Sequence, residues 1–205
     1  MDLNKAEMAR AQIDMKAGEL KIRGGAAKLL EAEFSYEDDL WKPEVRYGES
    51  GFRGNLRIWQ PHIPFRVGPG GGGSKNEWDL RLKDDVPLDL EVSLGAGKSV
   101  LDLKGLYLRS LDVHMGAGEV DLDLTGKWRK SFDARVRGGV GRATVYLPKE
   151  VGVEATARGA IGEIRADGFT RSGHNYTNGA YGKTPVTLRV DVEGGIGEIN
   201  LRLEP

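Results

Sequence analysis

The chain has 205 residues with 30 basic and 31 acidic side chains, which give a formal net charge of −1 at pH 7. This length is enough for a buried core, and the balanced charge offers no basic stripe, so we predict no nucleic-acid partner. The chain has no cysteine, which excludes disulfides, thiolate nucleophiles and cysteine zinc sites. It also has no apolar run of the length of a membrane span.

After a polar lead-in over residues 1–10, a repeated pattern begins around Gly18. Apolar residues lie 7, 5 and 3 positions before this glycine and 2 and 4 positions after it, with polar residues mostly between them. Alternation of this kind is typical of half-buried strands. The same frame fits five more glycines, which are Gly97, Gly118, Gly141, Gly162 and Gly197.

The alternation slips by one residue at each of these six anchor glycines. A slip of one residue would turn every later side chain to the other face of the sheet unless the backbone bends or bulges. Glycine reaches the positive φ of such a bend without steric cost. The residue just before the anchor is apolar in all six copies, as Ala17, Ala96, Ala117, Val140, Ile161 and Ile196.

A step of about 21 residues between copies predicts an all-β, stacked two-sheet solenoid. We expect a single domain over residues 1–205 in which successive copies are parallel neighbours. The residue after the anchor would then form a column of alternating charge, Lys98, Glu119, Arg142 and Glu163. An antiparallel β-sandwich is the alternative architecture.

The region between the first two strong copies departs from this period. Residues 25–60 predict an atypical end with strands near Phe34 and Val45, which would form a hairpin that closes the stack. Two weaker copies are predicted at Gly54 and Asn76. Between them, residues 60–77 are rich in proline and glycine and predict a loop. This loop lacks the Gly-Lys-Ser order of a phosphate-binding loop.

A second long loop is predicted at residues 167–185, which mix aromatic, hydrogen-bonding and glycine residues. This composition is typical of recognition loops. The alternative interpretation is a loop whose tyrosine and phenylalanine side chains fold back and cover the end of the stack. From the two long loops we select the following partner-binding candidates: Phe65, Arg66, Phe169, Arg171, His174, Tyr176 and Tyr181.

Catalytic candidates are few. Asp102 and Asp123 occupy the same position of adjacent copies and Asp121 lies nearby, so their carboxylates could bind a cation or cleave a polysaccharide. Outer-face surface residues are the alternative interpretation. The histidines, His62, His114 and His174, show no metal-ligand spacing. We expect the four tryptophans to be core or cap residues, and we predict no catalytic residue, metal or cofactor.

Several segments resemble the bacterial toast-rack domains. These segments are residues 15–26, 30–34, 43–45 and 87–90, together with the two Gly-Ala-Gly motifs at 95–97 and 116–118. Toast-rack domains are related to LiaF-like cell-envelope stress proteins and to adhesin-like domains. The resemblance implies a stacked β module outside or attached to the membrane, without catalytic residues.

We therefore expect a noncatalytic, extracytoplasmic module of the cell envelope, exported or lipid-anchored, whose export segment lies outside the given sequence. It would present loops or a sheet face to a protein or envelope component, as an adhesin or a stress sensor. The alternatives are a carbohydrate-binding or carbohydrate-active β-helix protein that uses the Asp102 face, and a structural spacer. The sequence leaves the ligand and the oligomeric state open.

Overall fold

A computed structural model describes residues 6–61 and 75–204, which form an open sheet of twelve strands. The single helical turn of the described residues is η1 (Asp39–Trp41). The strands are β1 (Met8–Arg23), β2 (Leu30–Tyr36), β3 (Glu44–Ser50), β4 (Arg53–Trp59), β5 (Asn76–Leu82), β6 (Leu88–Asp102), β7 (Leu108–Asp123), β8 (Phe132–Pro148), β9 (Gly152–Asp167), β10 (Thr170–Ser172), β11 (Asn175–Thr177) and β12 (Thr187–Glu204).

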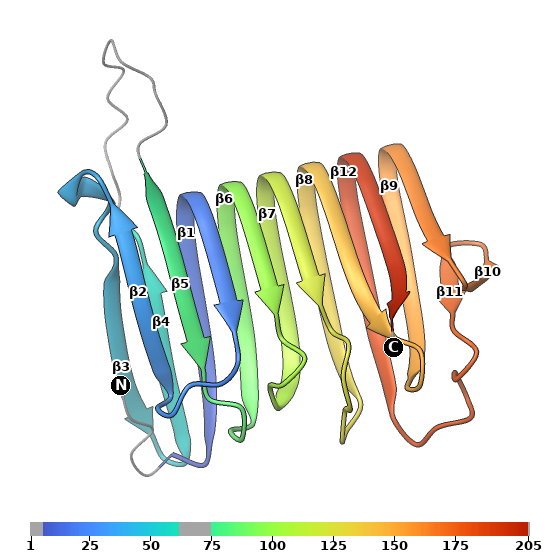
Figure 1. Cartoon of the computed structure of the whole chain (residues 1–205), viewed down its shortest axis with the longest axis horizontal. Helices are drawn as coiled ribbons and strands as arrows, with labels where there is room; N and C mark the ends of the chain where they lie inside the picture. The colour runs from blue at the N-terminus through green and yellow to red at the C-terminus, as the bar shows by residue number, and fades with distance from the viewer. Residues whose placement is uncertain (1–5, 62–74, 205) are drawn as a thin grey trace.

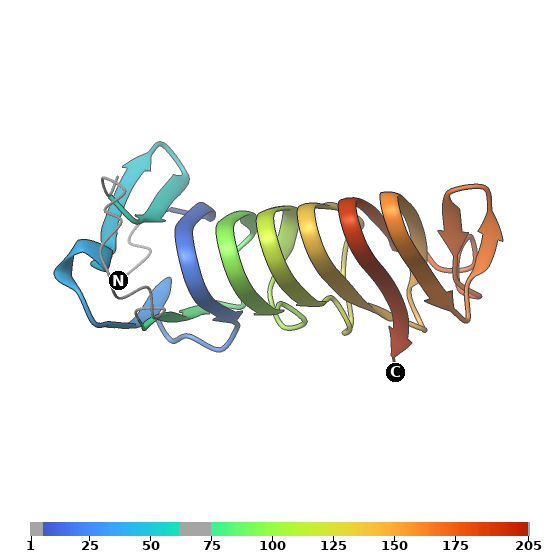
Figure 2. The same cartoon turned by 90° about the horizontal axis from the view of Figure 1, so that it is seen from above.

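The six long strands, β1, β6, β7, β8, β9 and β12, each bend at the anchor glycine. We call the part before the glycine the first limb and the part after it the second limb. Both limbs pair in parallel with the same limbs of the neighbouring strands, and glycine lies opposite glycine. The result is a row of arches with two layers of strands, which Figures 1 and 2 show from the side and from above. The predicted all-β stack is confirmed.

The bends require glycine for two reasons. All six anchors have φ between +131° and +140°, a region that residues with a side chain rarely adopt. The arches are also stacked closely, so that a Cβ atom built on Gly118 would lie 1.9 Å from the carbonyl oxygen of Gly97. The predicted change of direction at glycine is therefore both a conformational and a packing requirement.

The core lies between the two layers. Apolar residues that alternate along each strand meet the equivalent residues of the next strand, as Val92, Val113 and Val136 do. Each such residue is almost fully buried. Burial of one side chain of this size stabilises the fold by about 1.5–3 kcal/mol, so the repeated pattern is the main source of stability.

The apolar residue before each anchor does not join this core. Val140, Ile161 and Ile196 are 53%, 65% and 50% exposed. They lie on the outer side of the bend, because the chain turns at the next residue. Although the alternation in the sequence runs through this position, its side chain points outward.

The order of the strands in the stack differs from their order in the chain. The stack runs β1, β6, β7, β8, β12, β9, so the last strand of the chain lies between two earlier ones. Glu198 of β12 therefore lies between Arg142 and Glu163 in the predicted charge column. The alternation of charge ends at Glu198, because Glu163 has the same charge. The Arg142 guanidinium lies 3.3 Å from both Glu119 and Glu198, while Glu163 pairs with Arg165 of its own strand.

The two weaker copies form one coil that is split between two strands. Leu56 of β4 pairs with Ala11 in the first limb of β1, and Trp78 of β5 pairs with Leu20 in its second limb. The copy at Asn76 is confirmed, since its carbonyl oxygen approaches Gly18 as an anchor glycine would. The prediction of a copy anchored at Gly54 is wrong. It made Leu56 and Ile58 part of a second limb, whereas β4 pairs with the first limb of β1.

The atypical end of the stack is closed by two separate strands. β2 pairs antiparallel with β5, and β3 pairs antiparallel with β4. Both predicted strands exist, but they cover different layers and do not pair with each other. The prediction of a hairpin is therefore wrong, whereas the closure of this end is confirmed.

Candidate binding surfaces

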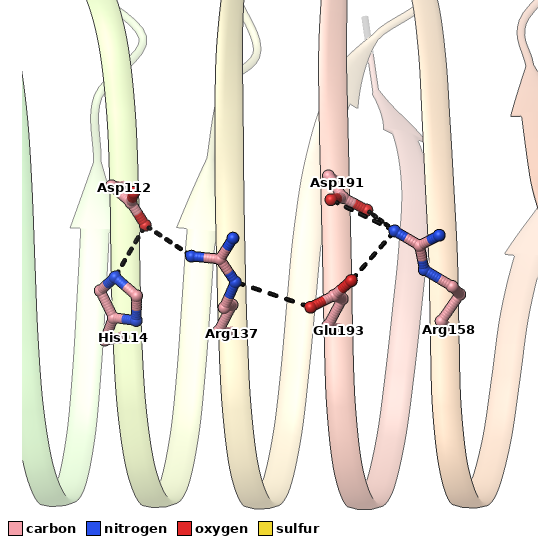
Figure 3. Close-up of polar contacts among 6 residues, drawn as sticks. All are labelled: Asp112, His114, Arg137, Arg158, Asp191 and Glu193. Carbon is pink, nitrogen blue, oxygen red and sulfur yellow. Dashed lines mark hydrogen bonds and ion pairs between the residues drawn. The ribbon is translucent and has the colours of Figure 1, made fainter.

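The outer face of the first limbs carries a ladder of alternating charges across four strands (Figure 3). Arg137 of β8 lies 3.8 Å from Asp112 of β7 and 3.6 Å from Glu193 of β12. Arg158 of β9 then pairs with Glu193 at 3.0 Å and with Asp191 at 3.1 Å.

His114 lies at one end of this ladder, with its Nε2 atom 2.9 Å from Asp112. Its side chain is 43% exposed, so it lies on the outer face of the strand. Each exposed pair contributes about 0–1 kcal/mol to stability. The three carboxylates and two guanidinium groups of this ladder pair with one another across neighbouring strands, so each of these charged groups already has a partner within the protein.

The predicted carboxylate cluster does not assemble into a cation site. Asp102 and Asp123 are neighbours, but the Lys104 ammonium lies 3.3 Å from one and 3.5 Å from the other. The nearby Asp102 carboxylate, followed by Asp123, raises the pKa of Lys104 above its usual value. Asp121 faces Lys98 at 3.9 Å instead. Over residues 6–61 and 75–204, no three acidic or histidine side chains form a metal-binding group.

Three of the tryptophans, Trp59, Trp78 and Trp128, make ring contacts within the protein. Trp78 is buried and meets Phe34 edge to face with a centroid distance of 5.4 Å. Trp128 donates its indole N–H to the Leu124 carbonyl at 2.7 Å and contacts the Phe132 ring. Trp59 lies beneath two arginine guanidinium groups on the outer face of β4. None of these arrangements forms an open platform for a sugar.

The C-terminal end of the stack is covered in part by the β10–β11 hairpin. β11 pairs with residues 154–156 of β9, and Tyr176 of β11 is only 3% exposed within the core. Phe169 packs against the same core. These two predicted binding residues therefore cover the end of the stack, as the alternative interpretation of this loop expects.

The other predicted residues of this loop lie near the surface. Arg171 and His174 are exposed, and the Arg171 guanidinium lies over the Tyr176 ring at 5.6 Å. Tyr181 is 40% exposed, and its hydrogen bond to Glu154 raises the pKa of its phenol. Phe65 and Arg66 of the other loop, like His62, lie outside the described residues.

Asn178 is an important residue that the sequence does not reveal. Its side-chain amide donates to the carbonyl oxygens of Pro148 at 3.0 Å and Val151 at 2.7 Å, and it accepts from the Val153 N–H at 3.0 Å. It therefore fixes the β8–β9 turn to the segment that leads into β12. A single asparagine in a polar loop gives no sequence signal for this role.

A second feature that the sequence reasoning missed is an apolar cavity of about 70 Å³ beneath the bends of β8, β12 and β9. It is lined mainly by glycine and aliphatic residues. Its signal in the sequence is a glycine three residues before the anchor in these three strands, where the first three strands have methionine or leucine.

The fold and these surfaces can be compared with known proteins. The family model of the N-terminal domain of toast_rack matches residues 1–146. The chain belongs to the toast-rack family. A crystal structure described as "a putative cell adhesion protein" from Clostridium sporogenes superposes with a TM-score of 0.96 and 36% identity over 100% of this chain and 96% of the other.

Among curated proteins, none matches the toast-rack chain significantly. In the described part of the chain, no helix has the length and apolar character needed to cross a membrane.

Proposed function

We propose that this toast-rack protein is a noncatalytic binding module of the bacterial cell envelope with an adhesin-like role. The observation that carries the proposal is the likeness, over the whole chain, to a protein described as a putative cell adhesion protein. The observed arrangement of Asp102 and Asp123 also argues against the carbohydrate-active alternative. Both carboxylates form ion pairs with the Lys104 ammonium, which lies between them.

We further propose that contact with an envelope component is made at the C-terminal end of the stack, through Arg171, His174 and Tyr181. Tyr176 and Asn178 hold this segment on the stack from beneath, so the exposed side chains project from a fixed support. A supported loop loses little conformational entropy on binding, which favours affinity. Phe65 and Arg66 remain candidates for a further contact.

The test compares capture of the purified chain by immobilised envelope fractions. The variant Arg171→Ala/His174→Ala/Tyr181→Ala removes the proposed contacts and keeps the buried Tyr176 and Asn178. The matched control, Phe52→Ala/Arg53→Ala, removes two exposed side chains at the other end of the stack. Circular dichroism verifies that both variants are folded.

We expect the triple variant to lose at least tenfold in capture and the control to match the original chain. Equal capture by both variants would contradict the assignment to the C-terminal loop. A failure of the original chain to be captured by any envelope fraction would contradict the adhesive role itself.

A further inference from the structure

We propose that Arg46 of β3 and Arg57 of β4 bind the phosphate group of a soluble phosphate monoester. These two strands lie at the other end of the stack from the loop proposed above, and the site does not depend on that loop (Figure 1). The proposal rests on two unpaired positive charges that one tryptophan ring, that of Trp59, holds side by side.

The two arginines lie directly opposite each other in the sheet. β3 pairs antiparallel with β4, and Arg46 is the register partner of Arg57. Both are exposed and alternate with Leu56 and Ile58, which face the core. Like charges that face each other across two strands destabilise the pairing. Because positions that break such a local rule are often functional, this pair is a candidate site.

Neither guanidinium group is neutralised by a carboxylate. In the part of the chain that the structure describes, Arg46 and Arg57 form no ion pair. By contrast, Arg10 of the neighbouring strand β1 pairs with Glu91 at 3.1 Å, and each arginine of the ladder in Figure 3 contacts two carboxylates. The two positive charges at Arg46 and Arg57 are therefore available to a ligand.

The ring of Trp59 holds both guanidinium groups in place. Their Cζ atoms lie 5.4 Å (Arg46) and 5.0 Å (Arg57) from the ring centroid, and Trp59 itself is half-buried. A guanidinium group over an indole face is attracted by the quadrupole of the ring. Arginine side chains that a ring already holds lose less conformational entropy when they bind an anion, so the site is preorganised.

The surface beside the two arginines leaves room for a ligand. Gly48 follows Arg46 on the outer face of β3, and a Cβ atom built on Gly48 would find no neighbour within 4 Å. Its register partner Asn55 is exposed on the same face, and its amide carries N–H donors. A small ligand at Arg46 and Arg57 therefore meets open space and a further polar group rather than apolar bulk.

The charges select the ligand class. Two guanidinium groups supply two positive charges and forked N–H donors, which match the charge of about −2 and the three free oxygen atoms of a phosphate monoester. A carboxylate has half that charge and only two oxygen atoms. β3 also carries two acidic residues, Glu44 and Glu49, so a continuous anionic surface such as an acidic membrane is repelled at this edge. A single phosphate group on a soluble molecule avoids this repulsion.

The test titrates the full chain with glycerol 3-phosphate at constant ionic strength and about pH 8, where the phosphate group is doubly charged. The ¹H–¹⁵N NMR signal of the Trp59 indole, assigned with the variant Trp59→Phe, reports binding. We expect this signal to shift and to saturate. Acetate should bind more weakly by about tenfold or more, because it has half the charge, and glycerol should leave the signal unchanged.

Two single variants remove the proposed contacts one at a time. Arg46→Gln and Arg57→Gln each keep a polar side chain and should each lower the affinity for glycerol 3-phosphate by about tenfold or more. The matched control is Arg202→Gln, because the Arg202 guanidinium also lies over an aromatic ring, that of Tyr146, at 5.9 Å. It should bind normally. All three arginines are exposed, so the variants should fold, which circular dichroism verifies.

Vesicles test the choice of a soluble ligand. Phosphatidic acid in phosphatidylcholine vesicles presents the same phosphate monoester on a membrane surface. We expect the chain to stay in the supernatant when these vesicles are sedimented. Sedimentation that Arg46→Gln abolishes would overturn this choice and assign the site to a membrane surface.

Three further results would overturn the proposal. The first is the absence of any shift of the Trp59 indole signal with glycerol 3-phosphate. The second is an equal response to acetate at the same ionic strength, which would show general screening of charge. The third is unchanged binding by folded Arg46→Gln and Arg57→Gln, or an equal loss in Arg202→Gln, either of which would place the ligand elsewhere.

Discussion

At the scale of single residues, the anchor glycines carry the strictest requirement in the molecule. We predict that Gly118→Val prevents folding, or destabilises the fold by more than about 4 kcal/mol. The new Cβ would lie 1.9 Å from the Gly97 carbonyl oxygen, and valine would have to adopt a φ of +133°. Urea denaturation followed by circular dichroism measures the effect.

The control for this prediction is the same substitution at Gly48 of β3, where the space around the Cβ position is open. Gly48→Val should change stability by less than about 1 kcal/mol, because valine is favourable in strands. If both variants were equally stable, the close packing of glycine against glycine in the bends would be refuted.

Glu91 illustrates how an outer-face residue makes stability depend on pH. Its carboxylate accepts hydrogen bonds from Gln12 at 2.9 Å and Arg10 at 3.1 Å, which lower its pKa below the usual 4.5. A carboxyl group with a lowered pKa stabilises the fold above its unfolded pKa, and this contribution is lost as the pH falls through the folded pKa.

We therefore predict that Glu91→Gln lowers stability at pH 7 by less than about 1 kcal/mol, since the pair is exposed to solvent. The difference from the original chain should vanish in strong acid, where Glu91 is protonated in both the folded and the unfolded chain. Thermal denaturation across the acid range measures it. A difference that is the same at neutral and at strongly acid pH would refute the electrostatic origin.

At the scale of elements, the segment that leads into β12 is held by Asn178. We predict that Asn178→Ala costs about 2–4 kcal/mol, because it leaves the buried Pro148 carbonyl oxygen, the partly buried Val151 carbonyl oxygen and the buried Val153 N–H without their side-chain partner. Asn175→Ala, at an exposed position of β11, should cost less than about 1 kcal/mol. Thermal denaturation measures both, and equal effects would contradict the anchoring role.

The elements that the sequence predicts well are those whose chemistry is local. Each bend requires a glycine, and each limb requires alternating apolar and polar residues. The six long strands and their parallel stacking can therefore be predicted from the sequence. The assignment of β4 was wrong because it rested on this local alternation alone. Leu56 and Ile58 satisfy a period of two on either side of an anchor, so the pattern cannot distinguish a first limb from a second.

The binding candidates were predicted less well than the strands. Tyr176 and His174 lie two residues apart in a polar loop, yet one is buried and the other exposed. Which of the two packs against the core depends on where the β10–β11 hairpin meets β9. That meeting is a long-range contact, and no local pattern of residues encodes it.

At the scale of the whole molecule, the last strand of the chain completes the interior of the stack. β12 pairs with β8 on one side and β9 on the other. The repeat does not predict this insertion, because all six long strands have the same frame and each could follow any other. The charge of the residue after the anchor could have shown whether β12 or β9 lies beside β8. It does not, because this residue is glutamate in both strands, Glu198 and Glu163.

The absence of native cysteine makes the order of the stack directly testable. Val140 and Ile196 are register partners in adjacent strands, whereas Val140 and Ile161 are two strands apart, or about 10 Å. A disulfide cannot join residues whose Cα atoms are more than about 7 Å apart without backbone movement. All three side chains are exposed on the same line of bends, so oxidant has equal access to each pair.

We predict that Val140→Cys/Ile196→Cys forms an internal disulfide on mild oxidation and that Val140→Cys/Ile161→Cys does not. Mass spectrometry of tryptic peptides, with and without reductant, identifies the linked pair, and dilute protein limits bonds between molecules. The opposite outcome would place β9 directly beside β8 and β12 at the end of the stack.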